Sequence, residues 1–419
     1  MTKAESAASG LRNILVATAI AGILGYVVQL LAPALLASDE SYITFSVYWS
    51  TMYLFVAALS GVQQEITRGA REVDGGAPRS PLGRYTIIVA AVSLSAVIVM
   101  AALLGPLILP GSTVVLAAAL GVGVIGYILV AVLGGVLYGL RLWAAVAALT
   151  ISDALFRAVL VVVGLLAGWS AELIAFAISI PFGLAFLAVW LGVRRAVSGR
   201  VVLDVPLRRM LTNTLGTVLA AAAMGVLMNG LPTLLGITSR EADPAVLAGL
   251  ILAITVTRAP IVVPLLALQS YFLSILRGRG PVLRRRIFIA LGVTAAGVAV
   301  LSCAAALVGP WAIGVISGGR FTISAAMMAT ITAGAGLVAM MCITGPALLA
   351  QDRHVPYAAG WVVAAALTPI ALLLPIALDA RVALTLLVPP VVGLTVHLVA
   401  IWQAPGTDRA MPLEERPGF

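Results

Sequence analysis

From Ala245 to Leu276 the chain reads AVLAGLILAITVTRAPIVVPLLALQSYFLSIL, an apolar run with a single arginine near its middle. About 20 apolar residues in a helix cross the ~30 Å hydrocarbon core of a bilayer, so this run predicts a transmembrane helix. Arg258 costs at least ~2.5–3.5 kcal/mol at the centre of such a helix, and no acidic residue stands three or four positions away. We therefore expect Arg258 to face a protein interior or a water-filled cavity. Pro260 removes a backbone hydrogen bond just after it, which predicts a hinge.

The composition extends this interpretation to the whole chain. Of 419 residues, 62% are hydrophobic and only 10% are charged, and the mean hydropathy is +1.14. A water-soluble globular protein does not have this composition. The sequence contains no Cys/His cluster with metal-ligand spacing, no Ser/His/Asp set and no phosphate-binding P-loop, so we expect neither an enzyme nor a cofactor or metal.

The predicted fold is an all-α polytopic membrane protein with about twelve transmembrane helices. The predicted spans are Leu11–Ala37, Tyr42–Ile66, Gly83–Leu104, Val114–Leu140, Trp143–Gly168, Ala171–Arg194, Arg209–Gly236, Val246–Leu276, Ile287–Val308, Ile323–Leu349, Tyr357–Leu378 and Val382–Trp402. Around them we expect cytoplasmic tails at 1–10 and 404–419, six-helix bundles at 11–194 and 209–403, and a cytoplasmic linker at 195–208.

Basic residues are distributed unevenly between the two predicted sides of the membrane. With the N-terminus inside, twenty of them fall in cytoplasmic segments and only three, Arg240, Arg320 and Arg381, fall in external loops. Positive charge favours the cytoplasmic side. The sequence thus predicts a bacterial cytoplasmic-membrane protein with both termini inside, and leaves Arg157 and Arg258 as the two basic residues within spans.

Short motifs recur at an offset of about 200 residues and indicate two duplicated halves. The matched pairs are Leu31–Leu36 with Leu231–Leu235, Pro81–Tyr85 with Pro281–Arg285, Leu104–Pro106 with Val308–Pro310, and Gly135–Arg141 with Pro346–Arg353. Because six spans is an even number, both halves enter the membrane from the same side. The halves are then expected to be pseudo-symmetric about an axis along the membrane normal and to enclose a central cavity.

Three motifs carry a resemblance to a known group. They are Gly61–Arg68 at the end of span two, Leu137–Arg141 after span four, and Gly309–Phe321, a Gly-Arg-Phe segment before span ten. With twelve spans in two bundles, the chain resembles the multidrug/oligosaccharidyl-lipid/polysaccharide (MOP) exporter superfamily, and within it the O-antigen and capsule type of flippase. The related lipid II flippases usually have more spans, which favours the polysaccharide branch. The resemblance implies movement of an undecaprenyl-pyrophosphate-linked glycan to the outer leaflet by alternating access.

Candidate site residues come from the polar groups inside spans. Arg258 is predicted to bind an anion in the cavity, because a guanidinium holds phosphate oxygens bidentately; the alternative is a structural pairing with a carboxylate or with carbonyls freed by Pro260. Asp153 and Arg157 lie four apart in span five, hence on one helix face. They either neutralise each other or open to engage substrate phosphate or a proton. Arg157 and Arg258 are expected to contribute one arginine from each half.

Other polar residues have two interpretations. Gln63, Gln64 and Glu65 at the end of span two, with Gln269 as a counterpart in span eight, either line the inner mouth of the cavity or cap the interface. Gln29, Asn213 and Asn229 predict hydrogen bonds between helices. Five aromatic residues are interpreted mostly as interfacial anchors: Tyr42, Tyr48, Trp49, Trp311 and Trp361.

The sequence thus predicts a flippase that binds a lipid-linked glycan through its anionic headgroup. The first alternative is a drug/cation antiporter of the same superfamily, which needs an uncompensated carboxylate, whereas Asp153 has Arg157 beside it. The second is a non-transporting membrane scaffold for envelope assembly. Expected partners are membrane lipids and, from the resemblance alone, a polymerase or glycosyltransferase of the same pathway; nucleic acid is not expected.

Overall fold

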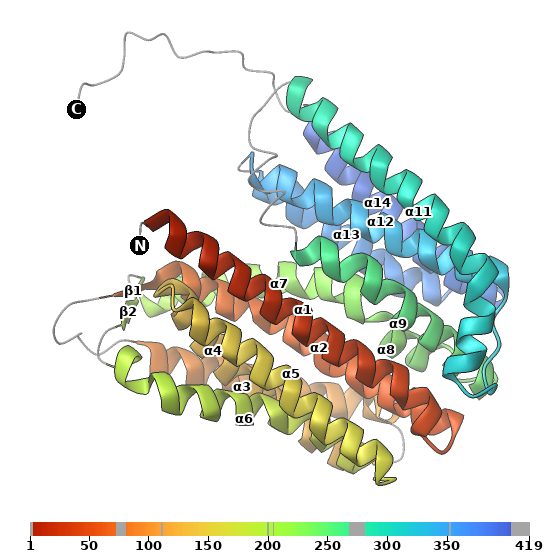
Figure 1. The fold of residues 1–419 in the computed structure, drawn as a ribbon, viewed down its shortest axis with the longest axis horizontal. Coiled ribbons are helices and arrows are strands. Elements are labelled where there is room, and N and C mark those ends of the chain that lie inside the picture. Colours follow the sequence, from red (N-terminus) through yellow and green to blue (C-terminus); the bar gives the residue numbers. More distant parts are fainter. Residues whose placement is uncertain are drawn as a thin grey trace.

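A computed structural model of the chain describes residues 3–72, 81–109, 112–198, 201–203, 205–267, 281–351 and 353–403 (Figure 1). It is almost entirely helical, because a backbone surrounded by hydrocarbon must satisfy its hydrogen bonds within its own segment. The elements are α1 (Lys3–Leu35), α2 (Asp39–Gly69), β1 (Ala70–Glu72), α3 (Leu82–Ile108), α4 (Thr113–Gly139), α5 (Trp143–Leu166), α6 (Ala171–Val197), β2 (Val201–Leu203), α7 (Leu207–Asn229), α8 (Leu231–Thr238), α9 (Pro244–Ala267), α11 (Pro281–Ile316), α12 (Ala325–Leu349), α13 (His354–Leu372) and α14 (Leu378–Gln403).

Eleven of the described helices are long and apolar enough to cross a bilayer. The remaining predicted span, Val246–Leu276, corresponds to α9, which is apolar from Pro244 to Arg258. The outer surface is also apolar: Leu307, Val114 and Leu103 are 82%, 81% and 73% exposed. Exposing such side chains to water is unfavourable, whereas lipid accepts them. The chain is an all-helical membrane protein, as its composition predicted.

The helices pack as two similar halves. Helices α1–α6 form the N-terminal lobe and α7–α14 form the C-terminal lobe. In the first lobe α1 packs on α5, α2 on α4, α3 on α4, α4 on α6 and α5 on α6; in the second, α7 packs on α13, α9 on α12, α11 on α12, α12 on α14 and α13 on α14. Corresponding helices of the two lobes therefore pack in the same pairs, which is the arrangement expected of a parallel repeat.

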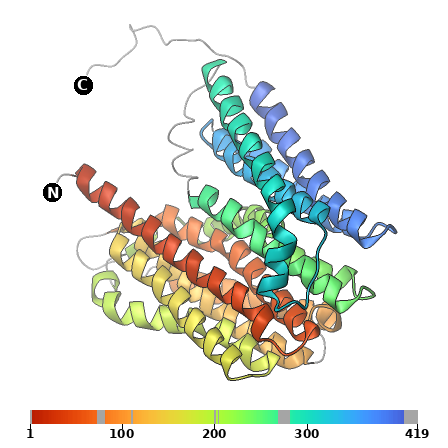
Figure 2. The same cartoon turned by 45° about the vertical axis from the view of Figure 1, so that its right-hand side comes forward.

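The lobes meet along two seams. In one, α2 of the N-terminal lobe packs on α7 and α8; in the other, α1 packs on α9 and α11. Figure 2 shows α1–α6 as one body and α11–α14 inclined away from it, with α9 between the two. Where α2 ends, β1 pairs with β2 in antiparallel register, Ala70 opposite Leu203. Strand β2 lies in the segment 195–208, where the sequence predicted a linker, and β1 follows α2 directly.

Several predicted boundaries are wrong. The first helix begins at Lys3, within the segment expected to be a polar tail. Span nine was expected to end at Val308, but α11 continues through Pro310 to Ile316. Span seven was expected to be continuous, but it is broken at Gly230 into α7 and α8. The predicted C-terminal tail from 404 lies outside the described residues.

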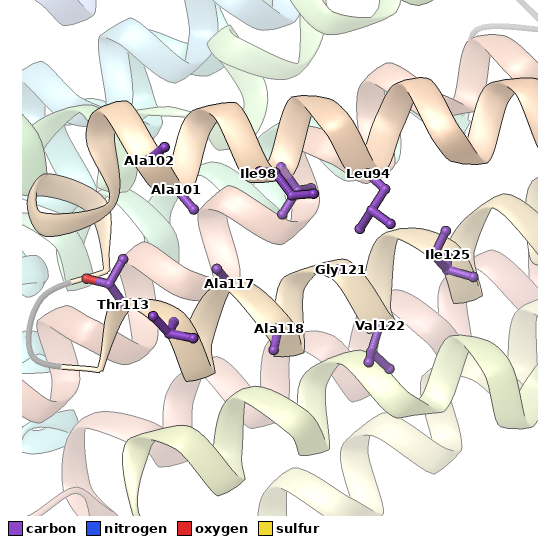
Figure 3. A pocket seen from close by; sticks show the side chains of 12 residues that line it. Leu94, Ile98, Ala101, Ala102, Thr113, Ala117, Ala118, Gly121, Val122 and Ile125 are labelled. Carbon is purple, nitrogen blue, oxygen red and sulfur yellow. The ribbon is translucent and has the colours of Figure 1, made fainter.

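A wide groove of about 750 Å³ separates α3 from α4 on the outside of the N-terminal lobe. Figure 3 shows Leu94 and Ile98 pointing from α3 toward α4, where Ala117 and Val122 line the opposite wall. The lining is apolar apart from Thr113, whose hydroxyl donates to the carbonyl of residue 109 at 2.8 Å. This groove therefore offers hydrocarbon contacts and no site for a polar headgroup.

Candidate functional site in the central cavity

A cavity of about 400 Å³ lies between the two lobes. Helices α1 and α2 form its wall on one side, and α7, α8 and α9 form it on the other. Its lining residues are Ala21, Gly22, Gly25, Tyr26, Gln29, Ser46, Trp49, Ser50, Tyr53, Ala57, Met224, Gly225, Met228, Asn229, Pro232, Ile254, Thr255 and Arg258. A cavity between two repeats is where transporters of this architecture bind their substrates.

Arg258 is the one charged side chain on this wall among the residues that the structure describes. It is brought there by α9, which begins at Pro244 after Asp243 Oδ1 accepts hydrogen bonds from the backbone amides of Ala245 and Val246 at 2.8 and 3.3 Å. At 1.5 Å per residue, Arg258 then lies about 21 Å along the helix, at membrane depth.

The Arg258 guanidinium has no counter-ion among the residues that the structure describes. The residue is only 9% exposed. Within the described part of the chain it makes no hydrogen bond or ion pair, and its Nε is buried without a partner. Because an arginine keeps its charge when buried, the cavity is cationic, and a ligand that enters it meets a guanidinium that no described residue pairs with.

Aromatic rings form much of the remaining wall. Trp49 and Tyr53 lie one helical turn apart on α2 and stack with ring centroids 5.2 Å apart and an interplanar angle of 17°. From α1, the Tyr26 hydroxyl donates to the backbone carbonyl of Val256 on α9 at 3.0 Å, which joins the two lobes beside the cavity. These rings give the cavity rigid surfaces that can pack against a sugar or another flat group.

Two polar side chains on the same wall differ in the partners they have. Ser46 Oγ is buried beside the Tyr42 hydroxyl, whereas the Gln29 amide makes no hydrogen bond within the described residues although the residue is 8% exposed. A buried polar group without a partner is costly. Gln29 therefore does not form the predicted bond between helices among the described residues, and its amide offers a donor and an acceptor to a ligand.

The interpretation as interfacial anchors is wrong for Tyr42, Tyr48, Trp49 and Trp361, which are buried or line the cavity, whereas Trp311 is 68% exposed. Tyr42 and Tyr48 are 0% and 1% exposed, and the Tyr48 hydroxyl is hydrogen-bonded to Ser179 Oγ on α6 at 2.7 Å. Trp49 lines the cavity. The spacing of four residues from Trp49 to Tyr53 was a signal for one inward helix face, because residues four apart lie on the same side of a helix.

Asp153 and Arg157 are paired inside the N-terminal lobe. The Arg157 guanidinium forms an ion pair with Asp153, donates from Nε to the carbonyl of Ile178 on α6 at 3.0 Å, and donates from Nη1 to Tyr53 Oη on α2 at 2.6 Å. Its central carbon also lies 4.0 Å from the centroid of the Phe182 ring. Arg157 is therefore not on the cavity wall and reaches it only through Tyr53.

The break between α7 and α8 lies at the cavity. Pro232 has no N–H to donate, and the chain turns at Gly230, so α8 starts with orphan amides. Ser50 of α2 fills the gap: its hydroxyl donates to the carbonyl of Asn229 and accepts from the amide of Thr233 at 3.3 Å. A broken helix with its free backbone groups beside a cavity is a recurrent feature of transporter binding sites.

Gln63, Gln64 and Glu65 lie away from the cavity. Gln64 is exposed, and Gln63 lies against Gly134 of α4 inside the N-terminal lobe. The Glu65 carboxylate accepts a hydrogen bond from Asn213 Nδ2 at 2.8 Å and pairs with Arg68 at 3.1 Å. Glu65 thus joins α2 to α7, and Asn213 makes the predicted bond between helices.

The remaining two predicted site residues lie on or near α9. Pro260 is inside that helix and lines a second groove, of about 610 Å³, between α9, α11 and α12. It faces away from the cavity side of α9, and its role as a hinge stays a prediction. Gln269 lies outside the described residues.

The Gly-Arg-Phe motif makes contacts between the lobes at the end of their interface that lies opposite to Glu65 and Asn213. After Gly318 and Gly319, which adopt φ of 64° and 85°, Arg320 donates to the carbonyl of Leu36 at 2.7 Å and pairs with Asp39 at 3.3 Å. The positive φ values favour glycine because other residues are strained there. This motif therefore ties the loop before α12 to the loop between α1 and α2.

Comparison with known proteins places the chain among bacterial relatives. No family model matches it. The chain is 34% identical over 394 residues to an uncharacterized protein of Mycobacterium bovis, covering 92% of this chain and 90% of the relative. It is 30% identical over 368 residues to an uncharacterized protein of Mycobacterium tuberculosis, covering 86% and 84%.

Solved structures with the same fold are transporters. An inward-facing MATE-family multidrug resistance transporter of the MOP superfamily aligns with a TM-score of 0.57 at 14% identity, covering 91% of this chain and 94% of that one. The lipid II flippase MurJ in an inward closed conformation aligns with a TM-score of 0.63 at 12% identity, covering 93% and 87%. A MOP superfamily transporter from Pyrococcus furiosus, described as having a binding pocket of reverse polarity, aligns with a TM-score of 0.51, covering 94% and 95%.

Proposed function

This chain belongs to the family of these mycobacterial proteins and has the fold of MOP superfamily transporters, and from its cavity we propose that it is a flippase for a lipid-linked glycan with an anionic headgroup. The substrate class is a polyprenyl-pyrophosphate-linked polysaccharide precursor of the cytoplasmic membrane. The headgroup would bind in the cavity and move between leaflets by alternating access, while the polyprenyl chain stays in lipid.

The observation that carries the proposal is the unpaired Arg258 guanidinium in the cavity between the lobes. A cation transporter gains affinity from a carboxylate in its cavity, and none lines this one among the described residues. A guanidinium instead binds phosphate oxygens through two parallel hydrogen bonds. Trp49, Tyr53, Gln29 and Ser46 offer the stacking faces and hydrogen bonds that sugar rings require.

Transport requires the lobes to move relative to each other, and the two ends of their interface favour such a movement. At one end Glu65 binds Asn213, and at the other Arg320 binds Leu36 and Asp39. Each cluster consists of one or two polar contacts between the lobes, which must break for that end of the cavity to open. The proposal assigns the two clusters as the gates on either side of the Arg258 cavity.

The test measures which leaflet holds the lipid-linked precursor in cells that carry the wild type, a deletion, Arg258→Ala or Arg258→Lys. We expect the precursor to accumulate on the cytoplasmic face in the deletion and in Arg258→Ala, with partial recovery in Arg258→Lys, which keeps the charge without the planar fork. Arg12→Ala, at an exposed position of α1, is the matched control and should behave as wild type.

Two other outcomes would change the assignment. Accumulation in the deletion alone would keep the flippase function and reduce Arg258 to a structural residue. Unchanged sidedness in the deletion, together with no flipping of the precursor by purified protein in liposomes, would reject the proposal. Accumulation of a fluorescent organic cation in the deletion strain would then support the antiporter of the same superfamily.

A further inference from the structure

Tyr53 has a hydroxyl proton that no described residue accepts. Its oxygen accepts a hydrogen bond from Arg157 Nη1 at 2.6 Å, and a guanidinium can only donate. The tyrosine therefore keeps its own O–H, and within the described part of the chain that O–H has no acceptor. Tyr53 is one of the residues that line the central cavity, and a ligand bound there is a candidate acceptor for this donor.

Arg157 is held too firmly to enter the cavity itself. Asp153 neutralises its charge, the carbonyl of Ile178 accepts from its Nε, and the Phe182 ring lies under its guanidinium. Only 4% of the residue is exposed. A cation that donates to the phenol oxygen polarises the O–H bond and strengthens it as a donor, since hydrogen bonds in series reinforce one another. Arg157 is thus a positioning residue that acts through Tyr53.

The ring of Tyr53 is also fixed from the side. It stacks on Trp49, which lines the same cavity. With its oxygen bound to Arg157 and its face against Trp49, the ring cannot turn away from the cavity without losing both contacts. The hydroxyl is therefore held in place before any ligand binds, and preorganisation of this kind reduces the entropy cost of binding.

We propose that the cavity binds an anion at two points, one from each lobe: the Arg258 guanidinium of α9 and the Tyr53 hydroxyl of α2, with Arg157 fixing the tyrosine as a donor. The ligand class is a phosphate or pyrophosphate group. This rests on the proposed function for the source of that group, a lipid headgroup. An anion held from both lobes also links its binding to the relative position of the lobes.

The test is binding of two probes, inorganic pyrophosphate and a polyprenyl pyrophosphate, to purified full-length protein in nanodiscs. Tyr53→Phe removes one hydroxyl and should raise the Kd for both probes by roughly 10- to 100-fold, the loss expected for a hydrogen bond to a charged group. Tyr48→Phe is the matched control. It removes a hydroxyl from the same helix, but that hydroxyl is bonded to Ser179 and does not line the cavity, so Kd should not change.

Arg157→Met distinguishes a positioning role from direct contact. It should raise Kd in the wild-type background and add nothing further in a Tyr53→Phe background, because its contribution passes through that hydroxyl. Independent, additive losses would overturn the positioning role. If Arg157→Met fails to fold, Tyr53→Phe alone still decides the proposal, since it leaves the aromatic packing unchanged.

The remaining outcomes separate this proposal from the proposed function. Wild-type affinity in Tyr53→Phe with lost affinity in Arg258→Met would overturn the two-point site and leave the flippase standing. Tighter binding of the polyprenyl probe than of inorganic pyrophosphate supports a lipid headgroup as the source. Equal binding of both probes supports a free anion, and so contradicts the flippase while keeping the two-point site. No binding of either probe to the wild type would overturn both.

Discussion

The Ser50 hydroxyl takes the place of a helix hydrogen bond that Thr233 cannot make. In an unbroken helix the amide of Thr233 would donate to the carbonyl of Asn229; here both groups bind Ser50 Oγ instead. Because Ser50 donates its proton to Asn229, the Thr233 hydroxyl must donate to Ser50 at 2.7 Å, and Thr51 must donate to Thr233 at 3.0 Å. A chain of hydroxyls from α2 thus stabilises the broken helix beside the cavity.

Replacing Ser50 by alanine should destabilise the protein by about 1–3 kcal/mol, because it leaves buried donors and acceptors at the helix break without partners. The measurement is the free energy of unfolding in detergent micelles by denaturant titration. Ser60→Ala is the matched control: Ser60 Oγ donates only to the carbonyl of Ala57 in its own helix. An equal loss in both variants would show that Ser50 has no special role at the break.

Glu65 should be coupled more strongly to Asn213 than to Arg68. The bond to Asn213 is a charge-assisted bond to a carboxylate on a residue that is 2% exposed, and its loss leaves the Glu65 charge buried without that partner. The Arg68 side chain is 64% exposed, and water screens such pairs. Double-mutant cycles should give about 1.5–3 kcal/mol for the first pair and about 0–1 kcal/mol for the second. The reverse order would contradict the gate assigned to Glu65.

Gly393→Ala should destabilise the C-terminal lobe by about 1–3 kcal/mol through overpacking. A Cβ there would lie 2.7 Å from the carbonyl oxygen of Gly360 on α13, a backbone atom with little freedom to move. Small residues of this kind allow α13 and α14 to approach closely. Gly292→Ala on α11 is the control, since no atom lies within 4 Å of its Cβ. Equal unfolding energies for the two variants would argue against this packing.

Arg320→Ala should loosen the junction between α1 and α2. It removes the bond to the Leu36 carbonyl and the ion pair with Asp39. Hydrogen–deuterium exchange of peptides covering residues 35–42 should become faster, because local opening costs less without these contacts. Asp39→Asn, which keeps the Leu36 bond, should have a smaller effect. Exchange unchanged in Arg320→Ala would exclude the residue as a link between the lobes.

Orientation in the membrane can be tested with single cysteines in a variant that lacks Cys303 and Cys342. From the charge distribution we expect Glu241→Cys to react with a membrane-impermeant thiol reagent in intact cells and Ser198→Cys to react only after the membrane is opened. Both positions are exposed in the structure. Labelling in the opposite order would invert the predicted topology.

Residue composition and spacing were sufficient to predict a helical protein that spans the membrane, and they identified Arg258 as a residue of interest. Hydrophobic windows and burial costs are local properties, so they follow from composition and spacing alone. The pairing of Asp153 with Arg157 is also local, because four residues bring side chains to one helix face. The break at Gly230 was not predicted from the sequence, because the hydroxyl that stabilises it belongs to Ser50 of another helix.

Which polar groups share the cavity depends on how the helices pack, and local sequence does not contain that information. Tyr53 and Arg157 are 104 residues apart in the chain, and their hydrogen bond exists because α2 and α5 belong to the same lobe. Helix packing likewise directed Glu65 to Asn213 and away from the cavity, and brought Trp49 inward from its expected place at the membrane surface. The free energy cost of burying a polar side chain can be estimated from its residue type. Which hydrogen-bond partner offsets that cost depends on how the helices pack.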